Sequence, residues 1–305
     1  MASLPELRPG QSIELLKELH ILTRDGKINQ DSRRKLKQVR HLCQFIEPLL
    51  DELVAANAAP TLVDHGAGKS YLGFILYDLF FQSRARGHIY GIEARAELVE
   101  RSRELAERLG FARMSFHHLN IAAALEAAEL VERSRELAER LGFARMSFHH
   151  LNIAAALEAA ELPTQIDIVT ALHACDTATD DAIRFALHRQ ARFIVLAPCC
   201  QAEVAAHLRR NKNIALAATP LAEMWRHPLH SREFGSQLTN VLRSLQLEAH
   251  GYQVTVTELV GWEHSLKNEL IIARRTGNRR GNASERIEQI LRQLHLEELR
   301  GRFID

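Results

Sequence analysis

Val63-Asp64-His65-Gly66-Ala67-Gly68-Lys69 is the stretch that decides the fold of this 305-residue chain. A short apolar run over 61–64 ends in a turn with two glycines, and an amphipathic pattern follows over 69–82. Glycine permits a tight turn and lets a ligand approach the backbone closely. The first turn of a helix leaves backbone amides without intrahelical partners. The stretch therefore predicts a strand, a ligand-binding turn and a helix.

The same alternation of short apolar runs and amphipathic segments continues outward from this turn. Strands are expected at 61–64, 88–93, 166–173 and 192–198, with a further strand in a repeated block, and helices at 69–82, 179–189 and 202–210. After a polar stretch, residues 252–260 and 268–274 read as a hairpin, and 284–299 as a last helix. This order predicts an α/β fold: a Rossmann-like, seven-stranded, mostly parallel sheet with helices on both faces.

Helical spacing also marks residues 12–57, where Pro48 suggests a kink or a break. The sequence therefore predicts three regions: an N-terminal helical extension over 1–57, the sheet domain over 58–276, and a basic linker and helix over 277–305.

A tandem repeat interrupts the sheet domain, because residues 96–127 recur without one change as residues 128–159. Structural repeats diverge, so a recent or engineered duplication explains this identity better than an ancient solenoid. Each copy reads as a helix, a strand and the start of a further helix. The extra copy is expected either to add a strand at the sheet edge or to form a helix-rich insertion that could swap into another protomer. A continuous helix is expected across the junction, from Ala122 to Leu141.

Composition limits the classes of protein to consider. The chain is 46% hydrophobic and 25% charged, which is ordinary for a globular protein. No apolar run reaches the roughly 18 residues of a membrane span, and no secretory signal is evident, so we expect a cytoplasmic protein without membrane contact. Four cysteines are too few for a disulfide framework. The composition says nothing about the oligomeric state.

Three ligand classes compete for the glycine turn. A nucleoside-triphosphate loop needs a glycine where Val63 stands, and a dinucleotide fingerprint needs one where Tyr71 stands. S-adenosylmethionine fits better, since Asp64 can accept a hydrogen bond from its ammonium, whereas a carboxylate would repel a pyrophosphate. Glu93, at the end of the second strand, can accept both ribose hydroxyls.

Other residues complete this expected cofactor site. Gly66, Gly68 and Lys69 form the turn, and a polar residue after the third strand is expected near adenine. That residue is Asn152 or its twin Asn120, since the duplication leaves open which copy is seated there.

From Lys37 to Arg274 the chain resembles the class I S-adenosylmethionine-dependent methyltransferases. Within them it is similar to a methyltransferase-domain family that includes tRNA-modifying relatives and glutathione-transferase C-terminal-domain proteins. The motifs that carry this resemblance are the Asp64-x-Gly-x-Gly turn, the segment 171–176 and Pro198-Cys199-Cys200. Relatives usually have glycine where Asp176 stands. The resemblance implies the fold, the cofactor and the transfer of a methyl group, but not the substrate.

The catalytic groups are expected at the carboxyl ends of the fourth and fifth strands. They are His173, Asp176, Cys199 and Cys200, and His173 would also line the cofactor. In one reading these groups shape a pocket and His173 or Asp176 removes a proton from the nucleophile. In a second reading a cysteine thiolate attacks a pyrimidine ring, and in a third the cysteines bind zinc. In a fourth the cysteines are small buried residues with a packing role alone. We expect no metal.

The substrate is the least defined part of the prediction. Basic residues cluster at 33–37, and Trp262, His264 and Lys267 precede the last strand. Cations and an aromatic side chain can hold an RNA backbone and stack a base, which favours tRNA or rRNA. The alternatives are methylation of a small molecule or of a protein side chain, and a cofactor-binding protein that the duplication has inactivated.

Overall fold

The computed structural model of the chain describes residues 7–56, 58–84, 86–118, 162–163, 165–172, 176–198, 201–210, 227–259, 269–278 and 281–304. Its seven strands form one sheet in the order β3-β2-β1-β4-β5-β7-β6. The pairs β1–β2, β1–β4 and β2–β3 are parallel, and β7 is antiparallel to both β5 and β6. The predicted Rossmann-like, mostly parallel sheet is therefore confirmed.

The chain divides into two compact units, Met1–Leu172 with His188–Gln190, and His173–Leu187 with Ala191–Asp305. The domain boundaries expected at 57/58 and 276/277 stay predictions.

The first unit carries the glycine turn. Its elements are α1 (Ile13–Glu18), α2 (Gln30–Ala55), β1 (Thr61–His65), α3 (Tyr71–Leu76), the π-helix η1 (Tyr77–Phe81), α4 (Gln82–Arg84), β2 (His88–Glu93), α5 (Ala96–Arg108), β3 (Met114–His118) and β4 (Ile168–Leu172). Ser12 and Asn29 begin α1 and α2 by accepting backbone hydrogen bonds from Leu15 and Ser32. The helix α2 runs through Pro48 to Ala55, so the break considered there does not occur.

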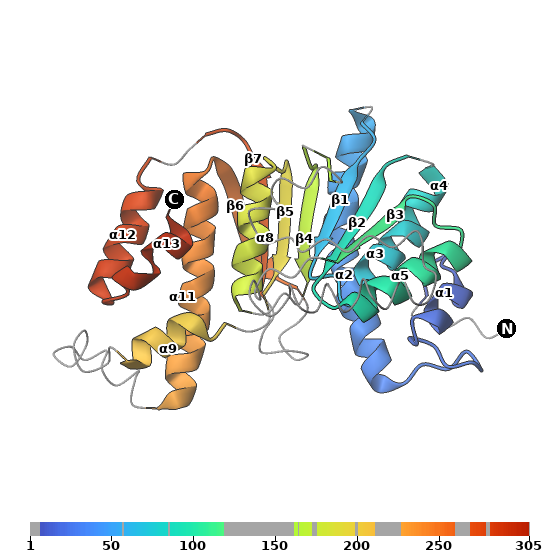
Figure 1. The fold of residues 1–305 in the computed structure, drawn as a ribbon, viewed down its shortest axis with the longest axis horizontal. Coiled ribbons are helices and arrows are strands. Elements are labelled where there is room, and N and C mark those ends of the chain that lie inside the picture. The colour runs from blue at the N-terminus through green and yellow to red at the C-terminus, as the bar shows by residue number, and fades with distance from the viewer. Residues whose placement is uncertain are drawn as a thin grey trace, which may run out of the picture. The chain divides into compact units, whose positions relative to one another are not determined.

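The second unit comprises α8 (Thr177–His188) apart from its last residue, β5 (Phe193–Ala197), α9 (Glu203–Arg210), α11 (Pro228–Ala249), β6 (Tyr252–Glu258), β7 (Glu269–Arg275), α12 (Ala283–Gln293), η3 (Glu297–Leu299) and α13 (Arg300–Phe303). Figure 1 shows α12 and α13 beside the long helix α11, and apolar residues of these helices share one core that includes Leu242, Ile287 and Phe303. The sequence analysis missed α11, which lies in its polar stretch, and the last helix ends at Gln293 rather than at residue 299.

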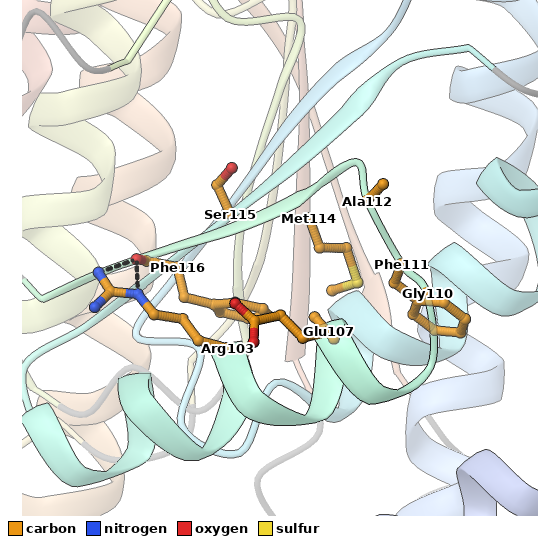
Figure 2. Close-up of a pocket in the computed structure, with 9 residues that line it drawn as sticks. Arg103, Glu107, Gly110, Phe111, Ala112, Met114, Ser115 and Phe116 are labelled. Carbon is orange, nitrogen blue, oxygen red and sulfur yellow. Dashed lines mark hydrogen bonds between the residues drawn. The ribbon is translucent and has the colours of Figure 1, made fainter. Parts of the chain in front are cut away.

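The first copy of the repeat occupies the position beside β2. Its helix is α5 and its strand is β3, which pairs with β2 in register Gly91↔Phe116. Figure 2 shows the Arg103 guanidinium of α5 reaching the strand, and its Nε and Nη2 donate to the Phe116 carbonyl at 3.1 and 2.7 Å. Residues 119–161, which include all of the second copy, lie outside the described residues. The extra strand and the fused helix therefore stay predictions.

Arg103 caps the outer edge of the sheet. The Ile89 amide donates to the carbonyl of Arg113, directly before β3, so this carbonyl and that of Ser115 face β2. Successive carbonyls alternate in direction along a strand, which turns the Phe116 carbonyl away from β2. A strand added beyond β3 would have to displace the guanidinium from this carbonyl.

Within the part of the chain that the structure describes, no helix is both long enough and apolar enough to cross a membrane.

Candidate functional site

The glycine turn lies at the carboxyl end of β1 and is fixed to the end of β2. Gly66 and Gly68 have positive φ angles of 72° and 58°, which residues with a Cβ rarely adopt. The Ala67 amide donates to the Ile92 carbonyl at 2.9 Å, and the Ser70 amide donates to the Ala67 carbonyl at 2.7 Å. The two glycines are therefore required by the backbone, and the turn stands where ligands of open parallel sheets bind.

Asp64 is a buried acid, and its hydrogen-bond partner among the described residues is a neutral hydroxyl. It lies near the end of β1 and is 2% exposed. The Thr170 hydroxyl donates a hydrogen bond to Asp64 Oδ1 at 3.1 Å. Burial raises the pKa of Asp64 to about 7; the Thr170 hydrogen bond opposes that rise and the Glu93 carboxylate adds to it. Burial also lowers the pKa of the adjacent His65 to about 4, so this imidazole is neutral at pH 7. Among the described residues, no side chain forms an ion pair with Asp64.

Glu93 is buried as well, but its carboxylate is held by three N–H donors. The Gly68 amide donates to Oε2 at 2.6 Å, while the Arg95 amide and Nε donate to Oε1 at 3.1 and 2.7 Å. Burial opposes ionisation, yet the hydrogen bonds from Arg95 and Gly68 outweigh it and lower the pKa of Glu93. A carboxylate has about four acceptor positions. Glu93 therefore keeps one on Oε2, and a second would open on Oε1 if the Arg95 side chain moved away.

The remaining described residues of the turn differ in exposure. Lys69 is exposed at the start of the helical segment, so it can meet a ligand only from the solvent side. Ser70 is fully buried in a left-handed conformation, and its hydroxyl has no hydrogen-bond partner among the described residues.

Asp176 lies in the second unit and caps a helix. Its Oδ1 accepts hydrogen bonds from the amides of Ala202 and Glu203 at 3.0 and 3.3 Å, at the start of α9. Its carbonyl accepts from Arg243 Nη2 at 2.8 Å. The carboxylate that we expected to act as a base therefore joins the segment after β4 to the segment after β5, and its catalytic role stays a prediction.

Several expected site residues lie outside the described part of the chain, namely His173, Cys199, Cys200, Asn120 and Asn152. Their roles stay predictions. The position of β3 bears on the choice between Asn120 and Asn152. Asn120, in the first copy, is two residues beyond the end of β3.

The sequence analysis did not identify two residues that contact the site, Thr170 and Arg95. Thr170 looks like any β-branched residue of a buried strand, and its partner Asp64 is 106 residues away in the chain. Arg95 follows Glu93 by two residues, and this spacing of opposite charges was the only signal available.

The hollow shown in Figure 2 is separate from this site. It is lined by residues of the first copy, among them Arg103, Glu107, Phe111, Met114 and Phe116. It includes the segment that enters β3, whereas the glycine turn follows the carboxyl end of β1. We assign the hollow no part in cofactor binding.

Comparison with known proteins identifies the family. A family model described as a methyltransferase domain matches residues 34–129 and again residues 121–207, which together are more than half of the chain. The two matches meet inside the duplicated block. A search of curated proteins found no match.

The solved structures to which the chain is similar include the following three. Magnesium protoporphyrin IX methyltransferase of Synechocystis PCC 6803, with bound SAH, is 13% identical with a TM-score of 0.38, over 86% of this chain and 94% of that one. The SAH-bound methyltransferase PaMTH1 of Podospora anserina is 11% identical with a TM-score of 0.41, over 86% and 87%. The fibrillarin pre-rRNA processing protein of Methanococcus jannaschii is 10% identical with a TM-score of 0.39, over 72% and 67%.

The family assignment rests on the sequence match and not on these distant structures. The chain belongs to the methyltransferase domain family and is a class I S-adenosylmethionine-dependent methyltransferase.

Proposed function

We propose that the turn after β1 holds S-adenosylmethionine, with Asp64 receiving the ammonium of its amino-acid end and Glu93 the ribose. The observation that carries this proposal is the state of Asp64, a buried acid whose partner is a neutral hydroxyl. A buried carboxylate is costly unless a cation meets it, so a ligand ammonium would compensate its burial.

The rest of the expected cofactor site fits the same ligand. Gly66 and Gly68 keep the turn free of side chains, Lys69 stands at its exposed end, and Glu93 closes it from β2. We assign the residue near adenine to Asn120 rather than Asn152, because β3 comes from the first copy.

The cofactor, when bound, supplies a methyl group on a cationic sulfur. Transfer to an oxygen or nitrogen needs alignment and at most one base. We propose that His173 and Asp176 serve as that base or orient it, and that Cys199 and Cys200 shape the substrate pocket.

RNA is the substrate class that we propose. Arg33, Arg34, Lys35 and Lys37 are all exposed near the start of α2, in the same unit as the glycine turn. Exposed cations at this density bind phosphates in a salt-dependent way.

A cofactor titration tests the first part of the proposal. Calorimetry with S-adenosylmethionine and S-adenosylhomocysteine should show binding by the parent protein, and Asp64→Asn should weaken it by at least tenfold, as expected for losing a charge-assisted contact. Undiminished binding by the variant would contradict the assignment of the site.

A second experiment identifies the substrate class. Labelled S-adenosylmethionine is incubated with the protein and with RNA, protein or metabolite fractions, and RNA is expected to take up the label. Arg33→Gln/Arg34→Gln/Lys35→Gln should weaken tRNA binding and flatten its salt dependence. The matched control, Arg209→Gln/Arg210→Gln/Arg292→Gln, removes the same charge from α9 and α12. Transfer to another fraction, or equal effects of the two triple variants, would refute RNA as the substrate.

A further inference from the structure

The pairing of β1 with β4 places a buried hydroxyl beside the buried acid. In the parallel register Asp64 is opposite Thr170, and paired residues present their side chains on the same face of a sheet. Thr170 is fully buried and its Oγ1 is 3.1 Å from Asp64 Oδ1. The contact is therefore built by the register of two central strands and not by a flexible loop.

The Thr170 hydroxyl has a partner in either charge state of the acid. It is within hydrogen-bond distance of two acceptors, Asp64 Oδ1 at 3.1 Å and the Val63 carbonyl at 3.3 Å. A hydroxyl carries one proton and can also accept. When Asp64 is ionised, the hydroxyl donates to Oδ1. When Oδ1 carries a proton, the hydroxyl accepts a hydrogen bond from Oδ1–H and donates to the Val63 carbonyl instead. Rotation about one bond connects the two arrangements.

The other ionisable groups around Asp64 do not provide this stabilisation. On β2, the Glu93 carboxylate disfavours a second negative charge. The Arg95 guanidinium, just before α5, is paired with Glu93 itself. On β1, His65 is neutral at pH 7. On β4, Thr170 is the polar partner that Asp64 meets, so its hydroxyl is the described donor that favours the ionised acid.

We propose that Thr170 is a positioning residue for cofactor binding: its hydroxyl holds the Asp64 carboxyl group in the orientation and charge state that receive an ammonium. This inference rests on the proposed binding of S-adenosylmethionine at Asp64. It adds a residue inside β4 to a proposed site whose other members lie at the ends of β1 and β2 or in the segments that follow β1, β3 and β4.

Its test is the pH dependence of cofactor affinity. The ammonium binds the ionised acid, so affinity should fall as the pH drops through the pKa of Asp64 in the free protein. Thr170→Val and Thr170→Ala remove the donor, and each should raise the pH midpoint by about one unit and weaken binding near pH 6.5 by about tenfold. Thr170→Ser keeps the hydroxyl and should retain the parent's midpoint. An unchanged midpoint in the valine and alanine variants would overturn the proposal.

Two controls separate this role from a general loss of packing. Thr239→Val removes another buried hydroxyl, which donates to the Gly235 carbonyl within α11, and should leave the midpoint unchanged. The probe 5′-methylthioadenosine lacks the amino-acid end, so its affinity should not respond to Thr170→Val; a response there would also count against the proposal.

The Asp64→Asn variant separates a failure of the proposed cofactor site from a failure of the proposed role of Thr170. If it binds the cofactor as tightly as the parent, the proposed function of the turn fails. If it loses binding while Thr170→Val keeps the parent's midpoint, the site stands and only the inference about Thr170 fails.

Discussion

Asp64 and Asp180 are equally hidden acids with different partners. Their residues are 2% and 3% exposed. Asp180 receives two hydrogen bonds from the fully buried Arg243, at 2.7 and 2.8 Å, whereas Asp64 receives one from a neutral hydroxyl. Asp180 is thus neutralised within the protein and serves the fold. Among the described residues Asp64 has no such ion pair, and this difference is what the proposed contact with a ligand ammonium would use.

The largest expected effect breaks the internal pair. Arg243→Leu leaves Asp180 buried without its cation, and we expect a loss of about 3–5 kcal/mol in the free energy of unfolding. Urea titration measures it. Arg243→Leu/Asp180→Leu should recover most of the loss, since a buried pair can often be replaced by apolar groups. A single variant as stable as the parent would show that Asp180 does not depend on Arg243.

The second prediction is that a substitution at Asp64 raises the free energy of unfolding rather than lowering it. The ordinary pKa of 3.8 rises to about 7 on folding, so the stability contributed by the protonated form is full below 3.8 and is lost as the pH rises through 7. Asp64→Asn does not ionise, and it should exceed the parent in stability by at most about 4 kcal/mol above pH 8. Thermal unfolding without ligand at pH 5 and pH 8.5 should show this advantage growing with pH. An advantage that shrinks with pH would contradict the shifted ionisation.

A third prediction asks whether Asp64 belongs to a larger cofactor site. If Asn120 follows the seated strand and contacts adenine, Asn120→Ala should weaken cofactor binding by about two- to tenfold, the effect of one hydrogen bond. Asn152→Ala is the matched control in the second copy and should have a smaller effect. Calorimetry compares the two, and equal effects would contradict the seating of one copy.

The smallest effect concerns Glu93. Its partner, Arg95, is a cation like the partner of Asp180, but the Arg95 side chain is exposed. Arg95 is 60% exposed in its side chain and occupies an acceptor position that a ribose hydroxyl could use. Since exposed ion pairs contribute about 0–1 kcal/mol, Arg95→Ala should tighten S-adenosylhomocysteine binding by no more than about fivefold. A 2′-deoxy analogue should gain less. Weaker binding by the variant would instead make Arg95 a cofactor contact.

The sequence predicts the glycine end of this fold well for a physical reason. β1 and β2 are short buried runs, and the turn between β1 and α3 requires glycine at positions with positive φ. These signals are local and need no knowledge of distant partners.

The sequence analysis missed α11 because the buried face of that helix is polar in part. Ser231, Thr239, Asn240, Arg243 and Gln246 are all buried on it, and they remove the apolar periodicity that marks a helix. Their burial depends on partners elsewhere, such as Asp180 for Arg243 and Glu269 for Asn240. Thr170 escaped notice in the same way, because its role depends on the register of β4 against β1.

The choice between the two copies could not be predicted from local propensities, since identical sequences have identical propensities. Connectivity favours the first copy, because α5 begins three residues after Glu93 and returns the chain to the open side of β2. The position of a copy along the chain, and not its composition, therefore decides which copy supplies β3.

Because the two copies of the repeat are identical, the chain can lose either copy and keep the other intact. Removing residues 96–127 or residues 128–159 yields one and the same chain, so a single deletion restores an uninterrupted methyltransferase domain whichever copy is lost. While both copies persist, a substitution that damages β3 or its Arg103 edge cap leaves an intact duplicate of the same 32-residue sequence directly after it. Elsewhere in the chain, at Asp64 or Thr170, a harmful substitution has no such reserve.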